Sequence, residues 1–211
     1  MNVERLVVLA GPPCSGKTTI IERLKSGDAA FLSDILKIKG SEKICFMDDW
    51  QLHKLNDSKI DQLVLHYDFL RPIRNGFEAF SSDPPLNVID SASEIVFVTF
   101  YAKPSILSAR LKKRKFKLLL RFPRPIRLYR TIIRLKNIKL SEKFCLSPEL
   151  NLHYDKWFEF CRGFDARGHW IVDTSGEEPQ MFELSDWISD PGLNACLSAP
   201  GSVDFKVDTN R

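Results

Sequence analysis

The chain has 211 residues, of which 44% are hydrophobic and 27% are charged, and its formal net charge is +4. This length fits one domain with a substantial core, and the composition is that of an ordinary globular protein. We expect neither a secretory signal nor a membrane span, because the apolar runs are too short for either. The five cysteines are scattered without a C-x-x-C pair, which predicts free thiols in a cytoplasmic protein rather than a disulfide framework or a zinc site.

A strand, a glycine-rich turn and a helix are predicted first along the chain. Residues 6–10 form a short apolar run typical of a buried parallel strand, and residues 18–24 have the spacing of an amphipathic helix that Gly27 ends. The turn between them fits the pattern G-x-x-x-x-G-K-[ST]. Its residues, with the one that follows, are Gly11, Pro12, Pro13, Cys14, Ser15, Gly16, Lys17, Thr18 and Thr19.

A turn of this kind, placed between a strand and a helix, is suited to bind phosphate. Its backbone N–H groups point into a concavity at the positive end of the helix dipole. We therefore expect it to bind a nucleoside triphosphate, with Lys17 at the β- and γ-phosphates and the Thr18 hydroxyl on Mg²⁺.

The rest of the chain alternates between short apolar strands and helices. Strands are predicted at residues 43–47, 62–67, 94–101 and 169–173, and helices from about 82, at 105–120, 126–139, 147–160 and 179–188. This alternation predicts an α/β fold with three layers, in which helices cover both faces of a five-stranded parallel sheet. Residues 1–190 are expected to form one domain, and residues 191–211 a flexible tail.

Ligands bind at the carboxyl ends of the strands in such sheets, so polar residues at these ends are candidates for the site. Asp68 ends an apolar strand and is expected to hold Mg²⁺, directly or through water; the alternative is an Asp that caps the next turn. Asp48 and Asp49 end the strand before it, and one of them should face the cleft because neighbouring residues alternate between faces. His66 either contacts substrate or is a core histidine bonded to the backbone.

These residues give the chain a resemblance to the P-loop kinases of small molecules, such as nucleoside, nucleotide, shikimate and gluconate kinases, and to the related polynucleotide kinases. The resemblance covers about residues 5–189. It depends on residues 11–18, on the acids that end the second and third strands, on Arg110-x-x-x-Arg114 and on residues 173–176. It implies the P-loop NTPase fold, with the strand order 2-3-1-4-5 and a helical lid. The absence of an N-K-x-D motif favours ATP over GTP.

The resemblance also implies how the acceptor is bound. Asp48 or Asp49 would bind the acceptor hydroxyl and act as its base, and Asp48 is preferred; alternatively, the pair caps a helix that starts at Trp50. Arg71, three residues after Asp68, resembles an arginine that contacts phosphate or acceptor in nucleoside kinases, although the spacing here is longer.

The lid and the adenine pocket follow from the same resemblance. Arg110 and Arg114 are one helical turn apart and would close over the transferring phosphoryl group as catalytic cations, unless they form a solvated basic face. Thr174 and Ser175 follow the last predicted strand, where these folds form the adenine pocket.

The expected lid, at about residues 102–146, is unusually long and basic. Residues 103–143 hold fifteen Lys and Arg and one acid, Glu142, whereas the rest of the chain has sixteen bases and twenty-six acids. Five arginines recur at intervals of three or four residues: Arg121, Arg124, Arg127, Arg130 and Arg134. Three interpretations are open, namely a solvated extension, a cleft for an anionic acceptor such as a phosphorylated sugar or nucleic acid, and a basic helix on anionic lipid.

The sequence therefore predicts an ATP- and Mg²⁺-dependent kinase that transfers the γ-phosphoryl group to a small hydroxyl-bearing acceptor, with or without a negative charge. Three alternatives remain. The first is a nucleic-acid-binding NTPase or polynucleotide 5′-hydroxyl kinase. The second is a sulfotransferase-like protein that binds a nucleotide sulfate donor, which the intact Lys17-Thr18 pair disfavours. The third is a nucleotide switch at an anionic membrane surface.

Overall fold

The computed structural model describes residues 2–26, 44–54, 59–75, 79–120, 125–145 and 149–190. The strands are β1 (Asn2–Gly11), β2 (Ile44–Asp48), β3 (Lys59–Asp68), β4 (Ala92–Tyr101), β5 (Gly168–Asp173) and β6 (Gln180–Glu183). The α-helices are α1 (Lys17–Ser26), α3 (Arg71–Arg74), α4 (Pro104–Leu120), α5 (Pro125–Cys145), α6 (Glu149–Arg162) and α7 (Leu184–Ser189). Three 3₁₀ segments are η1 (Asp49–Lys54), η2 (Phe80–Ser82) and η3 (Pro84–Ser91).

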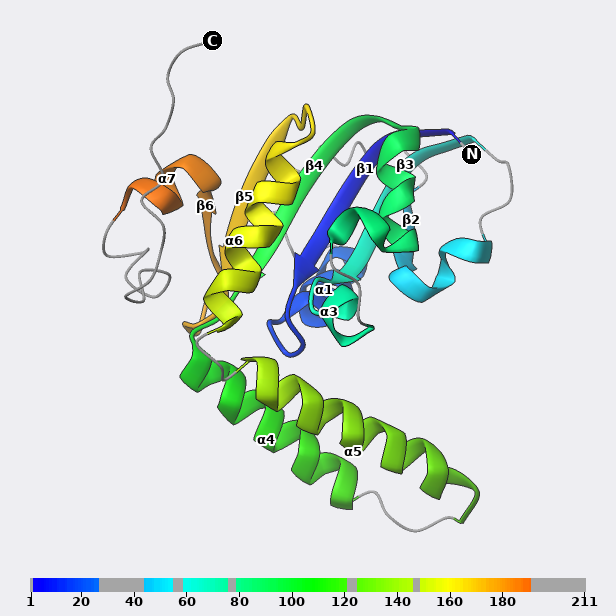
Figure 1. Cartoon of the computed structure of the whole chain (residues 1–211), viewed down its shortest axis with the longest axis vertical. Coiled ribbons are helices and arrows are strands. Elements are labelled where there is room, and N and C mark those ends of the chain that lie inside the picture. Colours follow the sequence, from blue (N-terminus) through cyan, green and yellow to red (C-terminus); the bar gives the residue numbers. More distant parts are fainter. Residues whose placement is uncertain are drawn as a thin grey trace.

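The described strands form one mixed, mostly parallel sheet in the order β2-β3-β1-β4-β5-β6 (Figure 1). The first five strands of this order are parallel and follow the predicted arrangement. The predicted count of five is wrong, because β6 pairs antiparallel with β5 and places Phe182 opposite Ile171. The predicted last helix, at residues 179–188, is also wrong in its first half. Residues 180–183 extend along the edge of β5, and α7 begins only at Leu184.

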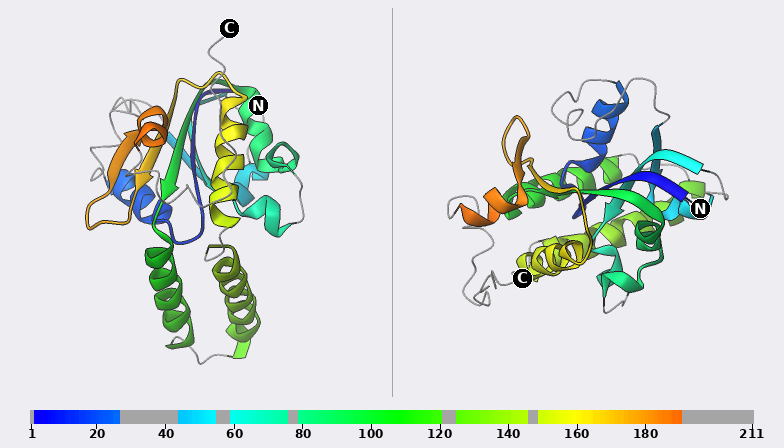
Figure 2. Two further views of the ribbon diagram at one scale, coloured as in Figure 1. Left: turned by 60° about the vertical axis from the view of Figure 1, so that its left-hand side comes forward. Right: turned by 90° about the horizontal axis from the view of Figure 1, so that it is seen from above.

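Apolar residues of the central strand alternate between two cores, one on each face of the sheet. Val7 and Leu9 pack with α1, whereas Leu6 and Val8 belong to the larger core under α6. Figure 2 shows α1 and α6 on opposite sides of the sheet. The protein is therefore an α/β protein whose sheet is buried between helices, as expected for short, continuously apolar parallel strands.

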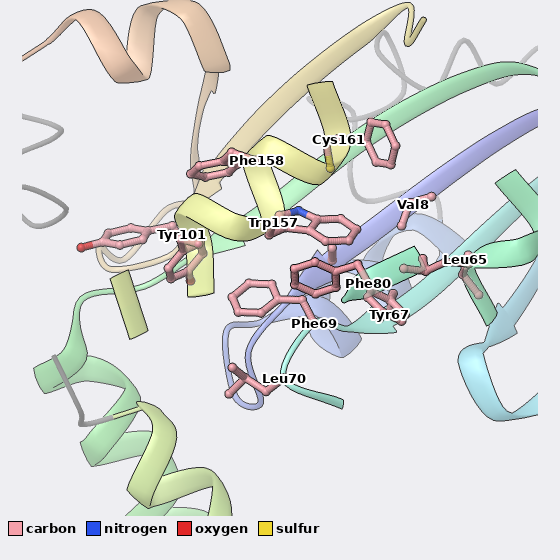
Figure 3. Packing of buried hydrophobic residues seen from close by; sticks show 14 of the residues in the cluster. Val8, Leu65, Tyr67, Phe69, Leu70, Phe80, Tyr101, Trp157, Phe158 and Cys161 are labelled. Carbon is pink, nitrogen blue, oxygen red and sulfur yellow. The ribbon is translucent and has the colours of Figure 1, made fainter. Parts of the chain in front are cut away.

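Aromatic side chains fill the larger core. Trp157 of α6 is fully buried among the rings of Tyr67, Phe69 and Phe80, with centroid separations between 5.2 and 6.3 Å (Figure 3). Tyr154, one turn earlier, donates a hydrogen bond to the carbonyl of Phe100 on β4 at 3.0 Å. These contacts fix α6 to the carboxyl half of the sheet.

Helices α4 and α5 form a hairpin that projects away from the sheet body (Figures 1 and 2). They occupy the segment expected to be the lid, and α5 extends beyond the predicted end at residue 139 to Cys145. The helix predicted from about residue 82 is instead the 3₁₀ segment η3, which begins at Pro84. None of the described helices is both long enough and apolar enough to cross a bilayer.

Several residues named in the sequence predictions lie outside the described residues. They are Gly27, Lys43, Arg121, Arg124 and residues 191–211. Arg127 and Arg130 lie in α5, where the description covers their backbone alone. The four described cysteines, Cys14, Cys45, Cys145 and Cys161, are free thiols.

Candidate functional site

The turn at the end of β1 folds around the side chain of its own lysine. Lys17 begins α1, is buried, and donates hydrogen bonds from Nζ to the carbonyls of Gly11 at 2.6 Å and Pro12 at 2.9 Å. Cys14 and Gly16 have φ angles of +66° and +97°, so the backbone of the turn curls back on itself. Successive N–H groups in such a turn form an anion-binding concavity at the helix N-terminus.

Close packing behind the turn explains why its first residue is glycine. A Cβ atom on Gly11 would lie 2.8 Å from the carbonyl oxygen of Phe100, which is a backbone atom of β4 and cannot move aside. The lack of a side chain therefore lets β1 and β4 stay in contact up to the first residue of the turn.

Burial also changes the electrostatics of Lys17. It lowers the pKa of the Lys17 ammonium to about 8, and the nearby Asp68 carboxylate partly opposes this shift. A buried ammonium is less well solvated than a surface lysine, so a phosphate anion beside it would be attracted strongly.

A cleft of about 640 Å³ opens over the turn. Residues 13–20 form its floor, and α4, α5, the carboxyl end of β3 and the segment after β5 form its walls. Among the described residues, five cationic side chains line it: Lys17, Arg23, Arg110, Arg114 and Arg134. Two acids do so as well, Asp68 and Glu177. The excess of positive charge suits a polyanionic ligand.

The two predicted lid arginines both point toward the turn. Arg110 donates from Nη1 to the Thr174 hydroxyl at 2.9 Å and to the Cys14 carbonyl at 3.3 Å, and from Nη2 to the Thr174 carbonyl at 2.5 Å. Arg114 is exposed, and its Nη1 lies 3.8 Å from the Cys14 sulfur. Arg110 is thus held in place at the base of the cleft by three hydrogen bonds, whereas the contact of Arg114 with Cys14 is exposed.

The residues after β5 contribute to the cleft unequally. Thr174 is buried and lines the cleft, and its hydroxyl lies 2.9 Å from the Ser15 carbonyl and 3.1 Å from that of Tyr101. Ser175 does not line the cleft; its hydroxyl accepts a hydrogen bond from the Lys103 N–H at 2.8 Å. Thr174 therefore shapes the site, and Ser175 fixes the start of the lid.

The predicted metal residues lie at the same edge of the sheet. Asp68 pairs in register with Gly11 and lines the cleft. Thr18 and Thr19 also line the cleft, and both are exposed. Asp68 Oδ1 also accepts a hydrogen bond from the Leu70 N–H at 3.1 Å, so the carboxylate caps the next turn as well. Hydroxyl and carboxylate oxygens beside a phosphate site fit Mg²⁺, which completes its shell with phosphate and water oxygens.

Asp48 and Asp49 have different partners. Asp48 Oδ1 lies 2.7 Å from Nδ1 of His66, a residue that lines the cleft. Asp49 pairs with Arg71 at 3.2 Å. The pKa of His66 is lowered by burial and by the positive charge of Lys17, against the pull of Asp48. Neither aspartate lines the cleft, contrary to the expectation that one of them would: His66 lies between Asp48 and the cleft, and Asp49 points to another set of side chains.

Arg71 belongs to a buried network behind the site. Besides Asp49, its guanidinium lies 3.6 Å from Oδ1 of Asp83, a fully buried carboxylate that also accepts a hydrogen bond from the Tyr67 hydroxyl at 2.8 Å. Arg71 does not line the cleft over the turn, so its expected contact with phosphate or acceptor stays a prediction.

Sequence reasoning missed part of the cleft wall. Arg134 was only one of five lid arginines, yet it lines the cleft with Asn137, Ile138 and Ser141 of α5. These residues recur at helical spacing on one face, which is the signal that could have singled them out. Arg23 and Glu177 also line the cleft, and no motif marks either of them.

Comparison with protein-family models and with curated proteins gives no match for this chain. Among the described residues, no group of three or more His, Cys, Asp or Glu side chains is arranged to hold a metal ion.

Proposed function

We propose that this protein is an ATP- and Mg²⁺-dependent kinase of the P-loop NTPase type, which transfers the γ-phosphoryl group to a small hydroxyl-bearing acceptor. The observation that carries this proposal is the turn of residues 11–18, folded around the Lys17 ammonium at the carboxyl end of a central strand. Asp68, in register with Gly11 on the next strand, supports a metal site beside the phosphates.

Cations around the cleft would supply most of the catalysis, because phosphoryl transfer mainly requires positioning and neutralisation of negative charge. Lys17 and the N–H groups of the turn would hold the β- and γ-phosphates. Arg110 and Arg114 reach the same turn from α4 and would neutralise the transferring group. Mg²⁺, held by Thr18 and Asp68, would add charge neutralisation at the phosphate oxygens.

The acceptor would enter beside His66. This imidazole lines the cleft, and Asp48 fixes its orientation through the 2.7 Å contact at Nδ1. An acceptor hydroxyl in this position would contact His66, and Asp48 would help to orient or deprotonate it through this pair. The walls from α4 and α5 would exclude water, which would otherwise accept the phosphoryl group.

A polynucleotide 5′-hydroxyl is the second candidate acceptor. Arg134 extends the positive wall of the cleft beyond the phosphate turn, onto α5. An acceptor that carries its own phosphate groups would contact this wall, and such binding would weaken steeply as salt is raised.

ADP release from Mg·ATP tests the proposal. Wild type, Lys17→Ala and Lys156→Ala would be assayed alone and with pooled nucleosides, pooled phosphorylated sugars or a 5′-hydroxyl oligonucleotide. Lys156 is an exposed lysine of α6 outside the cleft and serves as the matched control. We expect one pool to stimulate ADP release in wild type and Lys156→Ala, and no release above background in Lys17→Ala.

The other outcomes are equally informative. ATP binding without stimulation by any pool would replace the kinase proposal with a nucleotide switch. ATP binding that does not depend on Mg²⁺, with turnover of a nucleotide sulfate donor, would favour the sulfotransferase-like alternative. No binding of ATP by the wild type would overturn the proposal altogether.

A further inference from the structure

The α4–α5 hairpin exposes most of the large apolar side chains found on the surface of the described residues. Six of the eight such side chains are on these two helices, with exposed fractions between 37% and 67%. They are Phe116, Leu119, Leu120, Ile132, Ile133 and Leu140. Single exposed apolar residues are ordinary on a protein surface, but a group of them on one projecting unit indicates an interaction surface.

These side chains lie on the outer faces of the two helices, not between them and the body. On α4, Phe116, Leu119 and Leu120 follow one another at helical spacing, whereas Leu107 and Leu111 are buried. On α5, Ile132 and Ile133 are exposed although Ile138 is buried. Each helix of the hairpin thus has one apolar side that packs and another that does not. Figures 1 and 2 show it standing away from the sheet, where the described body does not cover it.

Lysines are interleaved with the outer apolar residues. Lys112, Lys113 and Lys117 on α4 and Lys136 and Lys139 on α5 are all exposed. Residues 103–143 carry fifteen Lys and Arg against one acid, so the whole hairpin is strongly cationic. Lysine can lay its aliphatic stem along an apolar layer and keep its ammonium at the level of charged headgroups.

We propose that the α4–α5 hairpin docks on an anionic lipid bilayer. The outer apolar side chains enter the boundary between headgroups and acyl chains, and the interleaved lysines contact the lipid phosphates. This inference concerns the outer surface of the hairpin and does not depend on the proposed kinase activity.

Two other partners fit the observations less well. A nucleic acid would pair with the lysines, but it would leave aliphatic side chains such as Leu119, Leu120 and Ile132 in water, since its binding surfaces rely on charge and on aromatic stacking. A second copy of the hairpin would cover the apolar residues, but it would place two strongly cationic surfaces against each other.

Vesicle flotation of the full chain tests the proposal. The protein would be mixed with vesicles of phosphatidylcholine alone or of equal parts phosphatidylcholine and phosphatidylglycerol. We expect flotation with the anionic vesicles, weakening at high salt, and none with phosphatidylcholine alone. The double variant Phe116→Ser/Leu120→Ser should lose about tenfold or more in vesicle affinity.

The chain supplies a matched control. Leu152 on α6 and Ile188 on α7, with exposed fractions of 51% and 39%, are the other two exposed large apolar residues. Leu152→Ser/Ile188→Ser should float like wild type. A charge variant, Lys113→Glu/Lys117→Glu, should lose binding to anionic vesicles while its melting temperature stays near that of wild type.

Several results would overturn the proposal. Flotation of Phe116→Ser/Leu120→Ser equal to wild type would do so, as would no flotation of the wild type. Oligonucleotide binding that the charge variant alone abolishes, without vesicle binding, would replace the bilayer with nucleic acid. A dimer in size-exclusion chromatography that Phe116→Ser/Leu120→Ser dissociates, again without vesicle binding, would replace it with a second copy. Because none of the three double variants changes a residue that lines the cleft, ATP binding in vesicle-free solution separates failure here from failure of the kinase proposal.

Discussion

Arg110 and Thr174 are 64 residues apart in the chain, yet the Arg110 guanidinium donates hydrogen bonds to the Thr174 hydroxyl at 2.9 Å and to the Thr174 carbonyl at 2.5 Å. The Thr174 hydroxyl lies near the carbonyls of Ser15 and Tyr101 in turn. This contact joins α4, the turn of residues 11–18 and the segment after β5 at a single point. The base of the cleft is therefore fixed by one arginine and one threonine.

Replacement of Arg110 should destabilise the fold more than replacement of Arg114. Arg110→Ala leaves three partly buried acceptors without a charged donor, so we expect a loss of about 1.5–3 kcal/mol in the free energy of unfolding. Arg114→Ala, whose side chain is exposed, should change it by about 0.5 kcal/mol or less. Urea denaturation of both variants checks this, and equal losses would contradict the distinction drawn between the two arginines.

Replacement of Asp48 should affect turnover, whereas replacement of Asp49 should affect stability. Asp48→Asn should lower acceptor-stimulated ADP release by about 10²–10⁴-fold with ATP affinity unchanged, because Asp48 reaches the cleft through His66. Asp49→Asn should mainly lower stability, since it breaks the pair with Arg71. Turnover and urea denaturation of both variants give the comparison. An inactive Asp49→Asn beside an active Asp48→Asn would reverse the assignment.

Gly16 should not tolerate a side chain. Its φ of +97° is strained for alanine, and a Cβ atom would lie 3.2 Å from the Thr174 methyl carbon. We expect Gly16→Ala to lose about 1–3 kcal/mol of stability and most of its ATP affinity. Gly176→Ala is the control, because its Cβ would meet nothing closer than 3.5 Å. Similar stabilities and affinities for the two variants would show that the backbone shape of the turn is not required.

Stability should fall on mild acidification because of His169. Its Nε2 lies 2.8 Å from the Thr99 hydroxyl, which itself accepts a hydrogen bond from Trp157 Nε1 at 2.9 Å. Burial lowers the pKa of His169 to about 3, while in the unfolded chain it is near 6.5. Between these values the unfolded state binds the extra proton, so stability decreases as pH falls.

The expected size of this effect is about 2 kcal/mol between pH 6.5 and pH 5. Urea denaturation at both pH values, for wild type and His169→Gln, measures it. The variant has no imidazole to protonate and should lose less stability over this interval. An identical loss in both proteins would assign the pH dependence to other groups.

Local patterns in the sequence were enough to predict the glycine-rich turn and the five parallel strands, because apolar runs and glycine spacing can be recognised within a few residues. They were not enough for β6, since residues 180–183 become a strand only by pairing with β5. Nor could local patterns show that Asp48 pairs with His66 and Asp49 with Arg71. Arg71 also lies beside the buried carboxylate of Asp83, and only the tertiary fold brings these residues together.

Arg134 illustrates the same limit within the lid. Spacing placed it among five arginines that recur at helical intervals, but its position beside the cleft depends on how α5 folds back along α4. Only the packed hairpin decides this, and it places Arg134 in the cleft with Ile138 and Ser141.

The hairpin is attached at both ends to the same part of the sheet. At its start the Lys103 N–H is bonded to the Ser175 hydroxyl, and beyond its end Tyr154 of α6 is bonded to the carbonyl of Phe100 on β4. The two connections of the hairpin to the body therefore lie next to each other at the carboxyl edge of the sheet. Ser175→Ala, which removes the acceptor of the Lys103 N–H, should loosen the start of α4 without changing the packing of α4 on α5.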